Sequence, residues 1–493
     1  MSGAVSAGPT AGQQAARRPG PSAGCLLRTE ILLALAAFAV LCIAVLAAAP
    51  QLVEPDDYAY RASIVALTDG HPLTLSTAQV TALAAQLNHA AGPGGAVSAS
   101  PGPLGSIVQW VQLPGGRWIS EKDPGYPFLA APFQFLGIIR VAPLFYGALG
   151  CLGLFFGARR WLGRYGGTVA VGLFCSSGAA LLFAWRDYMP TFTDASLIAA
   201  GTGALLWALL AGEATTRRRT WAGLLGFLAI EAAVFARYTN IVGLGCAVLA
   251  VPAVRWRRPA SVPRGALRWW LGSVVLFAVG VAAFDDLVYG GPFKSGYRPG
   301  EITFSLGAIG PNLRYLPRHL IAAMPMLVLG LAALAWIIAR WVKLRRAGGE
   351  QASPAGGEQA GGARRDLAVG LALAAAWFSV WGLYAAYTWT AMPGLSSLQD
   401  VRFYLPAIGP IALLGAWLVM RVARLPRRAS LAAVTSAAVV AAMFGLGIWS
   451  FTNMRAFRLG GGPMPARCNI GQHCPGGVTP GPRAAPGGPA KGN

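Results

Sequence analysis

The feature that most constrains this chain is a series of long apolar runs that recurs from Ile31 to Phe451. A helix needs roughly 20 mostly apolar residues to cross a bilayer, and these runs are close to that length. Of the 493 residues, 55% are hydrophobic and 12% are charged, which is about half the charged fraction of a typical soluble domain. A transmembrane β-barrel would instead show short alternating strands. The sequence therefore predicts an all-α polytopic membrane protein.

The apolar runs predict about eleven transmembrane helices. They are 31–49, 138–157, 168–185, 195–211, 221–236, 239–254, 269–289, 319–341, 367–389, 401–420 and 429–451. The neighbouring runs 221–236 and 239–254 are the shortest, so these two could be tilted, broken or partly re-entrant. Glu231 lies inside one of them, where an acidic residue needs either a partner on a neighbouring helix or a function.

The basic residues indicate how the chain is oriented. Many of the 40 Lys and Arg residues lie in short loops between the runs, for example Arg159-Arg160, Arg217-Arg218-Arg219 and Arg345-Arg346. Cytoplasmic loops retain positive charge, so the N-terminus is expected inside and the C-terminus outside. The formal charge of +22 does not indicate nucleic acid as a partner, because no basic patch is interleaved with aromatic residues. We expect a multi-pass protein of a bacterial cytoplasmic membrane.

The segments outside the runs differ in composition from the transmembrane domain, which is expected over 29–451. They are a disordered cytoplasmic tail (1–28), a long first outer loop (50–137), a second outer loop (290–318), a disordered inner loop (347–366) and a Gly/Pro-rich outer tail (452–493).

The first outer loop carries signals of internal structure. Ser76 and Gln79 fit a capping box, and the apolar residues that follow predict a helix over 76–89 that lies on the membrane surface. Residues 107–112 and 117–120 flank Pro114-Gly115-Gly116, which predicts a hairpin.

Two adjacent carboxylates, Asp56 and Asp57, follow the first run. Ionised groups are costly at the edge of a bilayer, so this pair suggests chemistry on a substrate that is anchored in lipid. A carboxylate can take a proton from an attacking hydroxyl, and arginine binds phosphate oxygens bidentately. Other ionisable residues at the predicted outer helix ends are Arg186, Asp187, Asp194, Arg237, Asp285, Asp286, Asp400 and Arg402.

Four short motifs, in this order, resemble the GT-C superfamily of integral-membrane glycosyltransferases, and in particular the protein O-mannosyltransferase and lipid A aminoarabinose transferase families. The motifs are Asp56-Asp57-Tyr58-Ala59-Tyr60-Arg61, Pro124-Gly125-Tyr126-Pro127-Phe128-Leu129, Arg237-Tyr238-Thr239-Asn240 and Arg402-Phe403-Tyr404-Leu405-Pro406. The pair is Asp-Asp where the O-mannosyltransferases have Asp-Glu.

The resemblance implies inverting transfer of a sugar from a polyprenyl-phosphate donor to a cell-envelope glycan, lipid or protein, at the outer face of the membrane. Asp56 would be the general base and Asp57 its partner. Arg237 and Arg402 would bind phosphate, with Lys294 and Arg298 as second choices, and Tyr126 and Tyr404 belong to the matching motifs. The sequence has no His/Cys metal-ligand spacing, although a divalent ion between the carboxylates stays open.

Two other functions stay open at this point. A transporter or flippase for lipid-linked or anionic solutes would show inverted repeats and polar residues near the bilayer midplane. A non-catalytic scaffold in cell-envelope assembly would tolerate loss of Asp56. The polar residues gather at one predicted face, which favours the enzyme.

Overall fold

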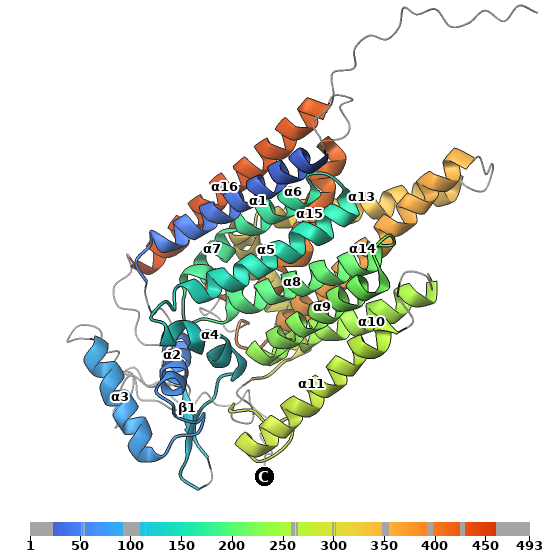
Figure 1. The fold of residues 1–493 in the computed structure, drawn as a ribbon. Helices are drawn as coiled ribbons and strands as arrows, with labels where there is room; N and C mark the ends of the chain where they lie inside the picture. The colour runs from blue at the N-terminus through green and yellow to red at the C-terminus, as the bar shows by residue number, and fades with distance from the viewer. Residues whose placement is uncertain are drawn as a thin grey trace, which may run out of the picture.

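The computed structural model describes residues 23–50, 52, 55–91, 109–113, 115–257, 262, 265–297, 300, 302–347, 354–391, 398–423 and 429–459. Helices account for most of these residues (Figure 1). The bundle consists of α1 (Ala23–Leu46), α5 (Val141–Leu162), α6 (Gly166–Cys175), α7 (Gly178–Trp185), α8 (Thr191–Leu210), α9 (Thr216–Ala236), α10 (Ile241–Arg257), α11 (Ala266–Tyr289), α12 (Ile309–Ala323), α13 (Met326–Ala347), α14 (Pro354–Ala385), α15 (Ile408–Ala423) and α16 (Ala429–Leu459).

The all-α polytopic fold is confirmed. Within the described part of the chain, nine helices are long and apolar enough to cross a membrane, or ten if the bent pair α6 and α7 forms one span. The span over Leu405–Ala423 is 89% buried within the protein, whereas Ala266–Tyr289 is only 6% buried. Helix α15 is therefore central, and α11 lies at the edge of the bundle (Figure 1). Apolar residues of α11 such as Val275, Leu276 and Val279 are exposed.

The structure refines the predicted spans. The run 168–185 is broken between α6 and α7, which meet at a bend of 61°. Ser177 caps the start of α7 by accepting a hydrogen bond from the Ala180 N–H (3.4 Å), and its hydroxyl donates to the Ala323 carbonyl (3.1 Å). Ser177 thus provides hydrogen-bond partners for backbone groups at the break, as irregular backbone inside a membrane requires. Of the two short runs, 221–236 is part of the full-length helix α9, while 239–254 corresponds to a shorter apolar helix.

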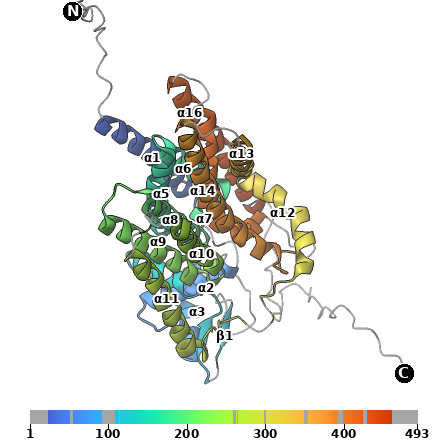
Figure 2. The same cartoon turned by 90° about the vertical axis from the view of Figure 1, so that its right-hand side faces the viewer.

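The predicted span 319–341 begins later than expected. The chain leaves helical geometry at Met324, and α13 starts at Met326. The residues before the break form α12, a separate amphipathic helix at the side of the bundle (Figure 2). Pro325 lacks the backbone N–H that a continuous helix would need at this position, which accounts for the interruption.

Helices α5 and α8 pack closely because small residues face one another. A Cβ atom at Gly203 would lie 2.1 Å from the Gly153 carbonyl oxygen, and one at Gly153 would lie 2.5 Å from the Ala200 carbonyl oxygen. Small residues that let two backbones touch are a common basis of helix association in membranes.

Gly203→Ala is expected to destabilise the protein by about 1–3 kcal/mol, because the added methyl group would collide with backbone that cannot move aside. Thermal unfolding in detergent would measure the loss. Gly280→Ala in α11 is the matched control, since a Cβ atom there meets nothing within 4 Å. Equal unfolding midpoints for the two variants would contradict the close α5–α8 contact.

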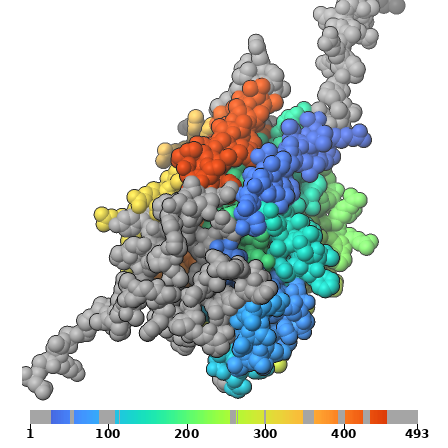
Figure 3. Space-filling model, turned by 90° about the vertical axis from the view of Figure 1, so that its left-hand side faces the viewer, coloured from blue at the N-terminus to red at the C-terminus, as the bar shows by residue number. Residues whose placement is uncertain are grey.

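The first outer loop folds into a small lobe at one end of the bundle, built from α2 (Pro55–Thr68), α3 (Thr77–Ala91), β1 (Trp110–Gln112), β2 (Trp118–Ser120) and α4 (Gly125–Phe135). In the space-filling view this lobe projects below the bundle, and α1 and α16 lie on the same outer face above it (Figure 3). The predicted hairpin is present: β1 and β2 pair antiparallel, with Trp110 opposite Ser120.

The predicted capping box is present at the start of α3. The Ser76 hydroxyl accepts from the Gln79 N–H (3.2 Å), and the Gln79 side chain accepts from the Ser76 N–H (2.8 Å). The apolar face of α3 does not lie open to a membrane, however. Val80 and Leu83 are buried against α2 and the hairpin, so protein covers the face that was expected to contact lipid.

Buried acidic residues connect helices at the opposite end of the bundle. Glu30 in α1 is fully buried and pairs with Arg159 (2.8 Å), and Asp366 in α14 contacts Arg340 (3.2 Å) and Arg421 (2.5 Å). The inner loop 347–366 was predicted to be disordered, but α14 begins at Pro354 and includes Asp366. Helix α1 likewise begins at Ala23, inside the predicted tail 1–28, and the outer tail is described only as far as Leu459.

Candidate functional site

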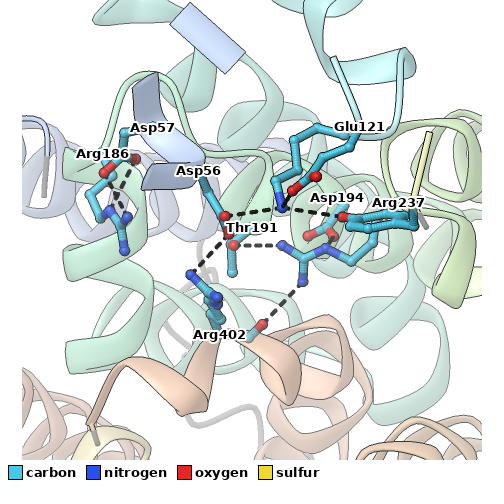
Figure 4. Close-up of polar contacts among 10 residues, drawn as sticks. Asp56, Asp57, Glu121, Arg186, Thr191, Asp194, Arg237 and Arg402 are labelled. Carbon is cyan, nitrogen blue, oxygen red and sulfur yellow. Dashed lines mark hydrogen bonds and ion pairs between the residues drawn. The ribbon is translucent and has the colours of Figure 1, made fainter. Parts of the chain in front are cut away.

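The two carboxylates of the first motif lie in the first turn of α2, just after Pro55. Pro at the first helical position and acids in the first turn both favour a helix start, since the ring presets φ and the carboxylates interact with the positive end of the helix dipole. Successive residues on a helix point about 100° apart, so Asp56 and Asp57 face different neighbours. Figure 4 shows Asp56 turned toward a cluster of charged residues and Asp57 turned away from it.

Asp56 lies between two cations. Lys122 Nζ is 3.2 Å from Asp56 Oδ1, and an Arg402 guanidinium nitrogen is 3.1 Å from Oδ2 (Figure 4). The Asp56 side chain is 17% exposed and that of Arg402 14%, so the pair is sheltered but within reach of a ligand. Burial opposes the charge of Asp56, but Lys122 and Arg402 outweigh it and hold the pKa of this carboxyl below its usual range.

Asp57 forms a separate buried ion pair. Its two oxygens accept from Arg186 Nε (3.3 Å) and a terminal nitrogen (2.6 Å), and each side chain is 1% exposed. Arg186 lies between α7 and α8, so the pair joins the lobe to the bundle. The structure therefore pairs Asp57 with Arg186, whereas Lys122 and Arg402 pair with Asp56.

Arg237 directly follows α9, and each of its guanidinium nitrogens contacts a neighbouring residue. Its Nε lies 3.2 Å from an Asp194 oxygen, and its terminal nitrogens donate to the Thr191 hydroxyl (2.7 Å) and the Arg402 carbonyl (3.3 Å). These contacts fix the backbone that carries Arg402. Asn240 donates to the same Asp194 carboxylate (3.2 Å).

The Pro-Gly-Tyr-Pro motif positions α4 against the end of α9. A Cβ atom at Gly125 would lie 2.3 Å from the Phe235 carbonyl carbon, so only glycine permits this approach. Tyr126 is fully buried, and its hydroxyl donates to the Asp187 carbonyl. Tyr126 thus holds the lobe against the bundle.

The remaining sequence-predicted residues lie apart from Asp56 or outside the described chain. Lys294 is exposed and donates to the Gly290 carbonyl (3.0 Å). Tyr404 is buried against Trp381, with ring centroids 5.5 Å apart. Arg298 lies outside the described residues. The structure therefore brings together Asp56, Arg237 and Arg402 out of the predicted set.

Sequence reasoning missed two neighbours of Asp56. Lys122 contacts Asp56, lies 3.3 Å from Glu121, and has its ammonium within 3.5 Å of the Tyr297 hydroxyl. The Gln109 side chain also lies near Asp56 and helps to lower the pKa of that carboxyl. The only sequence signal for Lys122 was its place in Glu121-Lys122-Asp123, directly before the Pro-Gly-Tyr-Pro motif. Gln109 carried no signal.

Asp123 is half-buried beside this cluster. Burial raises the pKa of its carboxyl to about 7, although Arg237, Lys122 and the backbone N–H of Tyr238 all favour its charged form. Because the unfolded value is about 3.9, the folded protein retains a proton that the unfolded chain releases. The stability from this site is therefore complete below about pH 4 and is lost as the pH rises to about 7.

Asp123→Asn is expected to flatten the fall in stability between pH 4 and 7, by up to about 1.4 kcal/mol per pH unit for one proton. Unfolding midpoints of the wild type and the variant across this range would measure the effect. Asp187, whose pKa burial also raises to about 7, contributes a slope of the same sign that stays in the variant. An unchanged pH profile in Asp123→Asn would show that Asp123 is ionised in the folded protein.

The carboxylates around Asp56 do not suit a metal ion. Lys122 Nζ lies between Asp56 and Glu121, where an ion bridging the two would have to sit. Among the residues that the structure describes, no group of three or more His, Cys, Asp or Glu side chains could hold a metal.

No protein-family model matches the chain, and no curated protein matches it. Among solved structures, it is similar to the apo Archaeoglobus fulgidus oligosaccharyltransferase (11% identity, TM-score 0.48), covering 86% of this chain and 56% of that one. It is also similar to ArnT from Cupriavidus metallidurans bound to undecaprenyl phosphate (14% identity, TM-score 0.47), covering 89% of this chain and 78% of ArnT. The oligosaccharyltransferase complex with Zn and sulfate matches at 12% identity and a TM-score of 0.47, covering 85% of this chain and 53% of that one.

Proposed function

We propose that the chain is a membrane glycosyltransferase that moves a sugar from a polyprenyl-phosphate donor to a hydroxyl of a cell-envelope acceptor. The observation that carries the proposal is the placement of Asp56 between Lys122 and Arg402, at one end of a bundle of apolar helices. A donor anchored in lipid would bring its phosphate to this depth. The order of the four sequence motifs supports the same reaction.

In this mechanism, the donor phosphate is bound by Lys122 and Arg402. Arginine and lysine are both common phosphate ligands, and arginine adds bidentate geometry. As these cations turn toward the phosphate, their hold on Asp56 weakens and its proton affinity rises. Donor binding would thereby convert a weakly basic carboxylate into a general base.

The proposed step forms one bond to the sugar, breaks one bond to the phosphate and moves one proton. The acceptor hydroxyl passes its proton to Asp56, and its oxygen attacks the anomeric carbon of the sugar. The bond from that carbon to the phosphate oxygen breaks, and polyprenyl phosphate leaves with the electron pair, which Lys122 and Arg402 stabilise. Attack from the side opposite the phosphate inverts the anomeric centre. No step passes through a metal, because Lys122 fills the position between the acids.

The site would face the outside of a bacterial cytoplasmic membrane. Clusters of Arg at the far end of the bundle, such as Arg159-Arg160 at the end of α5 and Arg345-Arg346 at the end of α13, support a cytoplasmic location for that end.

The test uses the full-length protein in proteoliposomes with an envelope extract as acceptor. Polyprenyl-phosphate-linked hexoses and pentoses are compared with the corresponding nucleotide sugars. The proposal predicts transfer from one of the lipid-linked donors and none from the nucleotide sugars. Transfer from a nucleotide sugar, or movement of the lipid-linked sugar across the vesicle membrane without transfer, would rule it out.

Arg402→Gln is expected to raise the KM for the lipid-linked donor by roughly tenfold, because the loss of a charge-assisted hydrogen bond to phosphate costs about 1.5 kcal/mol or more. Arg402→Lys should recover only part of this loss, since lysine cannot bind bidentately. Arg364→Gln, at an exposed position on α14, serves as the control. A donor KM that is unchanged in Arg402→Gln would remove this residue from the phosphate site.

A further inference from the structure

Gln109 has an unfavourable backbone conformation next to the candidate site. It lies directly before β1 with φ of +58°, in the left-handed region that residues with a Cβ atom seldom adopt. Its carbonyl accepts the Glu121 N–H (2.9 Å), which ties Gln109 to the segment that carries Lys122. Strain of this kind persists only where surrounding structure enforces it, and it is often found at functional sites.

The side chain of Gln109 is oriented by Asp56. The Gln109 side chain is near enough to Asp56 to help hold the pKa of that carboxyl below its usual range. A carboxylate only accepts hydrogen bonds, so the Gln109 amide faces Asp56 with its nitrogen. The amide oxygen is then directed elsewhere. This oxygen is buried and has no hydrogen-bond partner among the described residues.

A purely structural role does not explain both the nitrogen of this amide, which faces Asp56, and its oxygen, which has no partner among the described residues. Asp56 already contacts Lys122 and Arg402, so an additional donor adds little to its charge balance. An unpartnered buried acceptor is costly unless a ligand supplies the missing donor. Glycine would relieve the backbone conformation at this position, yet the chain has a long amide side chain there.

We propose that Gln109 is a specificity-determining residue whose amide oxygen accepts a hydrogen bond from a hydroxyl group of the donor sugar. This inference rests on the proposed function. The carboxylate that orients Gln109 also holds the two cations assigned to the donor phosphate. A group that enters beside Gln109 is therefore adjacent to that phosphate in the bound donor, and the sugar is the part of the donor attached there.

Two substitutions separate the effect of losing the amide group from the effect of relieving the backbone conformation. Gln109→Gly relieves the left-handed conformation and removes the amide, whereas Gln109→Met keeps the side-chain length and the strain. Both should lower kcat/KM by roughly threefold to tenfold, the effect of losing one neutral hydrogen bond. The unfolding midpoint of Gln109→Gly should not fall. A drop in transfer without a drop in stability is the expected result.

The decisive measurement pairs these variants with monodeoxy forms of the polyprenyl-phosphate sugar that the wild type uses best. One deoxy donor should be impaired with the wild type, and that impairment should vanish in Gln109→Gly and Gln109→Met. If every deoxy donor shows the same penalty in wild type and variants, Gln109 does not contact the sugar. The proposed function is tested separately, because Asp56→Asn should lower turnover by about a hundredfold or more whether or not Gln109 has this role.

Discussion

Asp56→Asn is expected to lower the turnover of sugar transfer by a factor of about a hundred or more. General acid–base catalysis by one positioned side chain contributes on this order, and asparagine cannot accept the hydroxyl proton. The substitution keeps the size of the side chain, and its one amide oxygen can still accept from Lys122 or Arg402. The donor KM should therefore change much less than kcat, and initial rates at several donor concentrations would separate the two.

Asp69→Asn provides the matched control for this experiment. Asp69 directly follows α2 and is exposed, so the same chemical change there should leave transfer at the wild-type rate. If Asp56→Asn also retains the wild-type rate, Asp56 is not the base. In that case the half-buried Asp123, next to Lys122, is the residue to test next.

Asp57→Ala is expected to destabilise the folded protein by about 3–5 kcal/mol. The Arg186 side chain is 1% exposed, and removal of its carboxylate would leave a charge in the interior without that partner, which is the costly way to break a buried ion pair. The pair joins α2 to the connection between α7 and α8, so the lobe should loosen from the bundle first. Thermal unfolding in detergent, together with protease sensitivity of the lobe, would detect this.

The double variant Asp57→Leu with Arg186→Met tests whether the loss comes from the isolated charge. Replacing both members of a buried ion pair by apolar side chains is often close to neutral, so much of the stability should return. Transfer by the folded fraction should also be retained. A variant Asp57→Ala that melts like the wild type but transfers no sugar would instead make Asp57 a catalytic partner.

The fold could be predicted from the sequence to the extent that it depends on apolar run length. Ten of the eleven predicted runs overlap helices or a bent helix pair that pass as spans, and the run 239–254 overlaps the shorter helix α10. The interruptions were harder to predict. Ser176-Ser177 and Pro325 lie within or beside apolar stretches. Average hydropathy does not detect a helix break when the polar groups at the break form hydrogen bonds, as Ser177 does with the Ala323 carbonyl.

The candidate site was predictable only in part, because it depends on contacts between distant segments. Asp56 and Arg402 are 346 positions apart, and only their motifs indicated a common site. Asp57 was predicted to be a partner of Asp56, but the helical rotation between neighbouring residues directs it to Arg186. Lys122 and Gln109 lie at the open end of the hairpin, just after β2 and just before β1. The sequence pattern does not specify how this end is placed against Asp56.

The contacts of Arg237 affect how mutational scans of this protein should be interpreted. All three guanidinium nitrogens are occupied by Asp194, Thr191 and the carbonyl of Arg402. A substitution at Arg237 would shift the neighbouring arginine and weaken affinity for the lipid-linked donor. Under the proposed function, a scan based on activity alone would then not separate a direct role of Arg237 at the phosphate from an effect that passes through the main chain of Arg402.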